Sequence, residues 1–145
     1  MSADGHDEGI LPELLGYHLR RAQLAVFADF VRSMTGIDLT PGQFGVLAQI
    51  AANPGLSQSA LGRAVGIERS SVVAVIDRLE KRKLVVRGKA DGDRRANALS
   101  LSAEGARLFR DASCRVRAHE RRIARGLTPA EARILATLLR KIVRP

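Results

Sequence analysis

Basic side chains gather around one charged turn in the second half of the chain. The segment KADGDRRANALSLS, residues 89–102, holds two acids, Asp91 and Asp93, and then Arg94 and Arg95. A guanidinium group can grip a phosphate, and it is favoured in the negative potential of a narrow minor groove. Because a carboxylate repels phosphate, we expect one aspartate to pair with an arginine and to fix the turn. An exposed pair contributes only ~0–1 kcal/mol to stability, so its value would lie in positioning the other arginine.

A second polar group stands at the start of an expected helix. In LSQSALGRAVGIERSSVVAVIDRLE, residues 56–80, apolar positions recur on both sides of Gly66, which predicts two helices joined by a tight turn. Arg69, Ser70 and Ser71 open the second helix. There an arginine can bind guanine O6 and N7, a serine can donate or accept, and the helix start favours phosphate. The alternative is a helix pair with a hydrated polar face, but the cations of the neighbouring hairpin favour DNA binding.

The overall charge also favours a polyanionic partner. The 145 residues carry a formal net charge of +9, with a sequence pI near 11.1. The first 55 residues carry −3, residues 56–102 carry +5 and residues 103–145 carry +7. Nucleic acid is the first expected partner and an anionic membrane surface the second. Hydrophobic residues make up 46% and aromatic residues only 3%, so aliphatic side chains must build the core.

Several other classes lack support in the sequence. Cys114 is the single cysteine, which excludes an intramolecular disulfide. The histidines do not stand at metal-ligand spacing, and no nucleophile elbow, phosphate loop or plausible pair of catalytic carboxylates is present. We therefore expect no enzyme, no catalytic residue, no cofactor and no metal. Without a signal peptide or an apolar stretch of ~20 residues, we expect a cytoplasmic protein and no membrane partner.

One domain with helical extensions is expected. Apolar spacing, caps and breakers predict six helices, followed or preceded by turns rich in Gly, Pro, Ser and Thr. They run from Ile10 to Gly36, Thr40 to Asn53, Ser57 to Val65, Glu68 to Lys81, Ser102 to about Arg125, and Thr128 to Ile142. Residues 84–87 and 98–101 alternate as two strands, with Leu84, Val86, Leu99 and Leu101 expected on one face.

The stretch from Leu39 to Gly105 resembles the MarR family of winged helix-turn-helix transcription regulators. LTPGQFGVLAQI resembles the second helix of that family, and LSQSALGRAVGIERSSVVAVIDRLEKRKLV resembles its helix-turn-helix and the start of its wing. Asp93-Arg94-Arg95, five further residues and then Leu101-Ser102 match the family pattern D-x-R-x5-L-T, with Ser in place of Thr. These motifs cover nearly half of the chain in the right order.

The resemblance implies a mainly α fold of the winged-helix (α+β) type, with six helices and a two-stranded wing. Residues 10–36 and 103–145 would form dimerisation helices, residues 37–102 the DNA-binding domain, and residues 1–9 a flexible tail. The fourth helix would enter the major groove and the wing would reach the minor groove.

A DNA-binding role follows for a defined set of residues. On the resemblance, Arg95 becomes the wing-tip arginine, Asp93 orients it, and Arg94 is free for phosphate. The expected DNA-binding residues are Ser57, Arg69, Ser70, Ser71, Arg78, Arg87, Lys89, Asp93, Arg94 and Arg95. The expected function is that of a homodimeric regulator of a palindromic operator on double-stranded DNA, a repressor released by a small aromatic or phenolic acid or an acyl-CoA-like anion. The alternatives are a sequence-indifferent architectural DNA-binding protein and, less favoured, a membrane-surface helix protein.

Three further clusters have open interpretations. Tyr17, His18, Arg20 and Arg21 could hold the carboxylate or phosphate of an effector, or form a hydrated helix face. The run from Arg115 to Arg125 could meet an anionic ligand or be solvated. Cys114 could be redox-active, although a buried or half-buried structural cysteine is favoured.

Lys83 departs from the family pattern, which usually has glycine before the first wing strand. If the backbone there is left-handed, lysine costs roughly 1 kcal/mol or more relative to glycine. The departure therefore concerns the angle of the wing and leaves the expected fold unchanged.

Overall fold

A computed structural model describes residues 5–66, 69–90 and 93–144. The order of elements is η1 (Leu11–Glu13), α1 (Leu15–Ser33), α2 (Pro41–Ala52), β1 (Leu56–Ser57), α3 (Gln58–Val65), α4 (Arg69–Lys81), β2 (Val85–Ala90), β3 (Asp93–Leu101), α5 (Ala103–Ile123) and α6 (Pro129–Val143). The protein is mainly helical, with six α-helices among the described residues, as expected.

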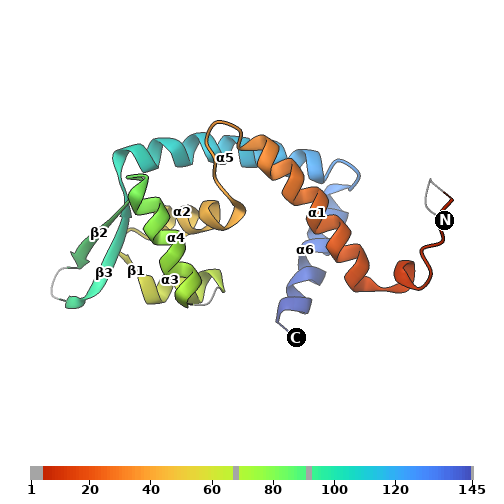
Figure 1. The fold of residues 1–145 in the computed structure, drawn as a ribbon, viewed down its shortest axis with the longest axis horizontal. Coiled ribbons are helices and arrows are strands. Elements are labelled where there is room, and N and C mark those ends of the chain that lie inside the picture. The colour runs from red at the N-terminus through yellow and green to blue at the C-terminus, as the bar shows by residue number, and fades with distance from the viewer. Residues whose placement is uncertain (1–4, 67–68, 91–92, 145) are drawn as a thin grey trace.

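The elements form a compact head and an extended arm (Figure 1). The head contains α2, α3, α4 and the sheet, and α5 runs from the head to the arm, where α1 and α6 lie. Among the described residues, no helix is long and apolar enough to cross a membrane.

The sheet has three strands, where the sequence predicted two. The strand order is β1-β3-β2, and both pairings are antiparallel. Leu56 pairs with Leu99 and Ser57 with Ala98, because the extended residues that precede α3 lie along β3. Gly55, at φ 89, donates its N–H to the Leu99 carbonyl at 2.9 Å and completes this edge.

The predicted inner face of the wing was wrong by one residue. Val85 pairs with Leu101 and is 2% exposed, whereas Val86 pairs with Ser100 and is 48% exposed. Leu84 is buried, but it lies before β2, in the turn that ends α4, so its burial does not extend the alternation of the strand. Directly paired residues share a face, so Val85 and Leu101 lie on the core side.

The first predicted helix is interrupted. Leu11–Glu13 form a 3-10 turn, Leu14 is extended (φ −95, ψ 121), and α1 begins only at Leu15. Pro12 lacks a backbone donor and Gly16 weakens the next turn, so a continuous helix is disfavoured here.

The core is aliphatic, as the composition predicted. Its best-buried members come from every layer of the head and from the end of α1, and three phenylalanines, Phe30, Phe44 and Phe109, are packed in or against it. The fully buried large residues include Met34, Leu47, Ile50, Leu61, Ile76, Leu79, Leu84 and Leu99.

Helix starts predicted from Thr40-Pro41 and Thr128-Pro129 are confirmed in detail. Each threonine hydroxyl accepts from the N–H of the third helical residue, and that residue's side chain accepts from the threonine N–H. This reciprocal capping satisfies two of the otherwise unpaired donors at each helix start.

Candidate nucleic-acid interface

The predicted groove-reading surface lies on α4, whose two sides differ in burial. Val72, Ile76 and Leu79 are each at most 1% exposed and pack into the core. Ser70 and Ser71 are exposed in the first turn, on the other side of the helix. The hydroxyls are therefore open to solvent at the N-terminal end of α4, the part of a recognition helix that contacts bases.

The glycine of the predicted tight turn, Gly66, has a left-handed backbone. Gly66 adopts φ 65 and ψ 27 and ends α3, which glycine does without a Cβ penalty. Ser57 caps the start of α3, since its Oγ accepts the Ala60 N–H at 3.1 Å. Ser57 is half-buried and its hydroxyl oxygen already serves the fold.

Five of the predicted DNA-binding side chains lie outside the part that the structure describes, and their roles stay predictions. They are the side chains of Arg69, Lys89, Asp93, Arg94 and Arg95. The backbone of the wing is described on both strands up to Ala90 and from Asp93, with an irregularity between Lys89 and Ala90. The Asp91 side of the predicted aspartate–arginine pairing also lies outside the described part.

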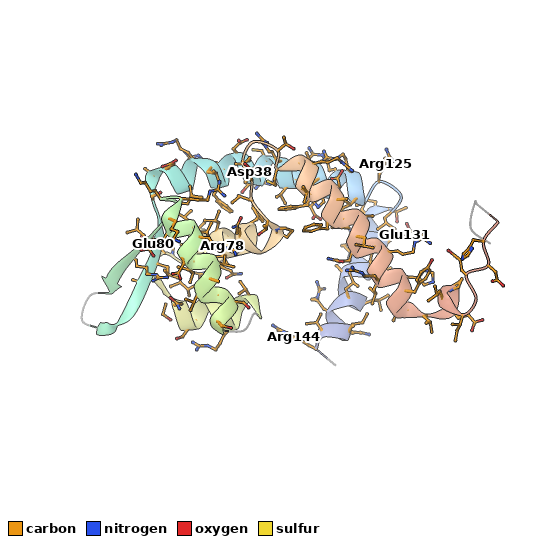
Figure 2. All side chains as sticks on the ribbon, viewed as in Figure 1. Asp38, Arg78, Glu80, Arg125, Glu131 and Arg144 are labelled. Carbon is orange, nitrogen blue, oxygen red and sulfur yellow. The ribbon has the colours of Figure 1, made fainter. Side chains whose placement is uncertain are left out.

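Arg78 has the placement expected of a phosphate contact. It is exposed in the last turn of α4, and Figure 2 shows it on the same helix as Glu80 in the head. A cation near a helix C-terminus is also favoured by the helix dipole.

Arg87 is engaged within the molecule. Its Nη2 donates to Asp77 Oδ1 at 2.5 Å, and its Nε lies 3.1 Å from Glu80 Oε2. The Nε–Glu80 contact meets the distance of an ion pair but not the angles of a hydrogen bond, and this Nε is otherwise unpartnered and buried. Arg87 thus joins β2 to α4, a placement the sequence did not indicate.

The junction between α4 and β2 confirms the left-handed backbone suspected at Lys83. Lys83 has φ 60, its N–H donates to the Glu80 carbonyl at 2.9 Å, and the Leu84 N–H donates to the Leu79 carbonyl at 3.0 Å. This pair of bonds is a Schellman ending, in which glycine is the usual residue at the position of Lys83. Leu84 and Leu79 are both buried and supply the accompanying apolar contact.

The first turn of α5 closes on this junction. Ser102 Oγ donates to the Lys83 carbonyl at 2.6 Å, and the Ser102 N–H donates to the Leu84 carbonyl at 3.0 Å. At Gly105 a Cβ would lie 1.9 Å from the Leu84 oxygen, so only glycine permits this approach. The base of the wing and the start of α5 are therefore one packed unit.

Arg82 ties the end of α4 to the loop that follows α1. Its Nη1 donates to the Asp38 carbonyl at 2.9 Å and its Nη2 to the Ile37 carbonyl at 2.7 Å. Asp38 itself has φ 54, so the guanidinium holds a loop with an uncommon backbone conformation.

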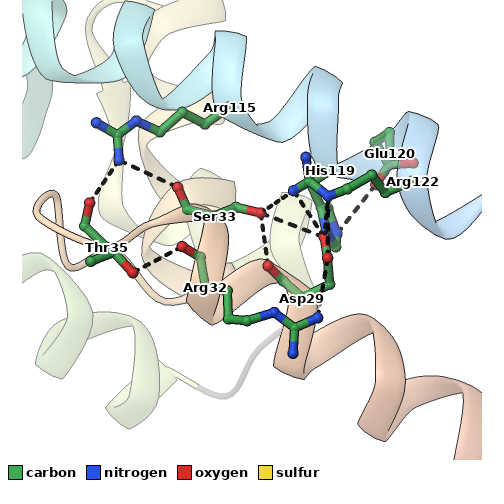
Figure 3. Close-up of polar contacts among 8 residues, drawn as sticks. All are labelled: Asp29, Arg32, Ser33, Thr35, Arg115, His119, Glu120 and Arg122. Carbon is green, nitrogen blue, oxygen red and sulfur yellow. Dashed lines mark hydrogen bonds and ion pairs between the residues drawn. The ribbon is translucent and has the colours of Figure 1, made fainter.

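A polar cluster on the arm joins α1 to α5 (Figure 3). His119 Nδ1 and Asp29 Oδ2 are 2.7 Å apart, and Arg122 Nη2 donates to the same oxygen at 3.0 Å and to Ser33 Oγ at 2.5 Å. Arg32 adds a contact to Asp29 Oδ1 at 3.3 Å. We call Asp29, Arg32, Ser33, His119 and Arg122 the α1–α5 cluster.

The α1–α5 cluster perturbs its carboxylate. Hydrogen bonds from Arg122 first and His119 second hold the pKa of the Asp29 carboxyl well below its usual range, and partial burial only opposes them. His119 is 2% exposed and its ring meets the Phe30 ring edge-on, with centroids 5.5 Å apart. Sequence reasoning missed this cluster, because Asp29 and Arg122 are far apart in the chain and no local motif links them.

The residues predicted for effector binding fall into two groups. Tyr17 Oη donates to Glu8 Oε1 at 2.9 Å and accepts from Arg21 Nη1 at 3.1 Å, and the Arg21 guanidinium lies over the Tyr17 ring. His18 Nε2 donates to the Pro12 carbonyl at 2.8 Å. These contacts bring Tyr17, His18 and Arg21 together near η1.

Arg20 points elsewhere on α1 and donates to Gln23 Oε1 at 2.8 Å.

The predicted basic run on α5 also divides. Arg115 donates to the Thr35 carbonyl at 2.7 Å, and Arg122 belongs to the α1–α5 cluster, so both have structural partners. Arg117, Arg121 and Arg125 are exposed. Cys114 is exposed as well, so the expectation of a buried or half-buried cysteine was wrong for the single chain. Among the described residues, no group of three His, Cys, Asp or Glu could hold a metal ion.

Comparison with known proteins places these features in a family. A model of the MarR family matches residues 37–96, which contain α2, α3, α4, β2 and the start of β3. A protein of Thauera aromatica, named as a candidate transcriptional regulatory protein for the hcr operon, is 40% identical over 131 residues. That alignment covers 90% of this chain and 79% of the relative.

Solved structures agree over nearly the whole chain. The transcriptional repressor CouR, bound to a 23-mer DNA duplex, is 40% identical with a TM-score of 0.89, and the match covers 96% of this chain and 99% of CouR. CouR bound to p-coumaroyl-CoA matches with a TM-score of 0.86 at 38% identity, over 95% and 97% of the two chains. The PcaV regulator of Streptomyces coelicolor, in complex with its natural ligand, is 28% identical with a TM-score of 0.85, and again covers 95% and 97%.

Proposed function

This chain belongs to the MarR family of transcriptional regulators, and we propose that it is a homodimeric repressor of a palindromic operator, released by a small aromatic ligand that carries negative charge. As a member of the family it is a DNA-binding transcriptional repressor and not an enzyme. One observation carries the proposed mode of DNA contact: α4 exposes Ser70, Ser71 and Arg78 beside a wing, in a chain that matches DNA-bound CouR with a TM-score of 0.89.

The homodimer is supported by the arm. None of the residues of α6 is buried in the single chain, although the helix has a wide apolar stripe. Large apolar side chains on α1 are also open to solvent, and exposed apolar surface of this extent is typical of an interface. The large apolar residues at least 36% exposed on these two helices are Leu15, Leu24, Val26, Phe27, Val31, Ile134, Leu135, Leu138, Leu139, Ile142 and Val143.

Two reading heads would then bind two half-sites. In a dimeric helix-turn-helix protein, half-sites lie one helical turn apart, about 34 Å, or a multiple of it. The symmetry of the dimer therefore favours a palindromic or near-palindromic site. In this arrangement Ser70, Ser71 and Arg69 read bases, while Arg78 and Arg94 contact phosphates.

The effector would bind where the arm meets the neighbouring protomer. Tyr17, His18 and Arg21 offer an aromatic face, an imidazole and a cation within one cluster near η1. This set suits a ligand with a ring and a carboxylate or phosphate. CouR has been solved with p-coumaroyl-CoA, and a related Mycobacterium tuberculosis protein with salicylic acid, which supports an aromatic acid or its CoA thioester for this chain.

Release would follow if DNA and ligand favour different distances between the heads of the two protomers. A ligand shifts such an equilibrium only by its difference in affinity between the DNA-competent state and the other state. Bound ligand should therefore lower DNA affinity, and bound DNA should lower ligand affinity by the same factor.

A combined experiment tests the proposal. Light scattering gives the mass in solution, selection from random duplexes gives the site, and competition with unrelated DNA gives the specificity. We expect a dimer, a site with two-fold symmetry, and dissociation by an aromatic acid or its CoA thioester. A monomer would exclude the dimer, and equal binding of all duplexes would favour the architectural alternative, in which counterion release supplies the affinity.

A further inference from the structure

Arg87 lies on the inner face of the wing. It pairs in register with Leu99, which is fully buried, whereas the neighbouring Val86 is 48% exposed on the outer face. The direction of its side chain is therefore toward α4 and the core. A residue whose task is to reach a phosphate from a wing strand would be expected on the open face.

The two groups that hold Arg87 are one helical turn apart on α4. Asp77 and Glu80 stand at positions i and i+3, so their carboxylates share one side of the helix. The Arg87 side chain is 28% exposed, against 51% for Asp77 and 45% for Glu80. The arginine is thus the more enclosed partner, and both carboxylates converge on it.

The charges explain why such a contact matters for a DNA-binding helix. Two carboxylates on α4 would repel the phosphates of DNA held against that helix. One guanidinium between them lowers this repulsion and uses both carboxylates to fix the strand. The same contact sets the angle between the helix that would enter the major groove and the hairpin that would reach the minor groove.

We infer that Arg87 is a positioning residue that sets the wing against α4 through Asp77 and Glu80 and makes no phosphate contact of its own. The inference rests on the proposed function, because it assumes that α4 and the wing engage DNA together. It replaces the sequence-based expectation that Arg87 is one of the DNA contacts.

The salt dependence of binding separates the two roles. A lost phosphate contact makes the slope of log affinity against log salt less steep by about 0.9. For Arg87→Gln we expect a loss of about tenfold in affinity at one salt concentration with an unchanged slope. Arg78→Gln, an exposed arginine on the same α4, is the matched control, and there we expect the slope to change by about 0.9.

A charge exchange supplies a test that does not depend on a single variant. Arg87→Asp should bind DNA weakly, and Asp77→Arg should not improve binding, because it repels Arg87. The double variant Arg87→Asp/Asp77→Arg should bind more tightly than the two single effects combined predict, by about fivefold or more. Urea unfolding of each variant shows that it is folded at the temperature of the assay.

The outcomes distinguish this inference from the proposed function. If Arg87→Gln makes the slope less steep as Arg78→Gln does, Arg87 is a phosphate contact and the inference is wrong. If the charge exchange is additive, Arg87 does not act through Asp77, and the inference is also wrong. If the wild-type protein binds no selected duplex, the proposed function itself fails. An unchanged slope with strong coupling between positions 77 and 87 supports the inference.

Discussion

Replacing Lys83 by glycine should stabilise the protein, although it removes a side chain. Lys83 has φ 60, and a left-handed conformation costs an L-residue with a Cβ about 1–2 kcal/mol. Glycine avoids this cost but loses roughly 0.5–1 kcal/mol more backbone entropy on folding. The Lys83 side chain is exposed, and both Schellman bonds use main-chain atoms, so the substitution leaves them intact. The net gain should therefore be ~0.5–1 kcal/mol.

Urea unfolding at a fixed protein concentration measures this gain. A matched control is Lys81→Gly, which changes the same residue type two positions earlier, at the last residue of α4, where the backbone is still right-handed and glycine should cost up to about 1 kcal/mol. The two variants should shift the midpoint in opposite directions without changing the slope of the transition. If Lys83→Gly destabilised the protein as much as Lys81→Gly does, the left-handed strain would not be the controlling term and the reasoning would be refuted.

Three further predictions concern other parts of the molecule. Gly105→Ala should destabilise the protein by ~1–3 kcal/mol or more, because its Cβ would lie 1.9 Å from the Leu84 carbonyl oxygen. The control Gly45→Ala, in α2 with nothing within 4 Å of the added Cβ, should be neutral or stabilising. The urea concentration at the midpoint of unfolding, compared with that of the wild type, measures both effects. Because folding lowers the pKa of Asp29, its ionised carboxylate should contribute fully to stability above its ordinary pKa of 3.8, and this contribution should be lost as the pH falls further. Unfolding measured between pH 2 and 6 should show that the difference in the free energy of unfolding between wild type and Asp29→Asn shrinks with acid. A difference that stays constant with pH would contradict this prediction. Leu138→Glu should convert the proposed dimer to a monomer in light scattering, because it places a charge in the open apolar stripe of α6. A dimer that persists in this variant would place the interface elsewhere.

Local signals in the sequence predicted much of the fold. Helix starts at Thr40, Ser57, Ser102 and Thr128 are short-range features, because each hydroxyl caps a donor three residues away. The left-handed turn at Gly66 is equally local. These features could be read without knowledge of the rest of the chain.

Errors arose where a residue's environment comes from distant segments. The pairing of Leu56 with Leu99 depends on two segments more than 40 residues apart, and no composition signal indicates it. Leu84 looked like the first inward residue of a strand, but it belongs to the helix ending, which moved the alternation to Val85. The break at Leu14 is a different kind of error, because its signals, Pro12 and Gly16, are local and were outweighed by the apolar spacing of the segment.

The candidate site was predictable in residue type more than in role. Ser70, Ser71 and Arg78 are exposed, which a DNA contact requires, and their role at DNA stays a prediction. Arg87 was assigned to DNA because of its charge, yet its neighbours Asp77 and Glu80 are supplied by another element. Whether a charged residue contacts DNA or holds two elements of the protein together depends on the partners around it and not on its residue type.

Helix α5 is held by side-chain contacts at two distant points. Its first turn is closed onto the Lys83–Leu84 backbone, and His119 holds Asp29 of α1 some 17 residues later, about 25 Å along the axis. A stiff rod fixed in this way acts as a lever arm. A tilt of only about 5° at Asp29 would displace the other end by roughly 2 Å, several times the ~0.5 Å within which a binding geometry must be kept. On the proposed function, a ligand that tilts α5 at the arm would move the head out of register with DNA without unfolding any element.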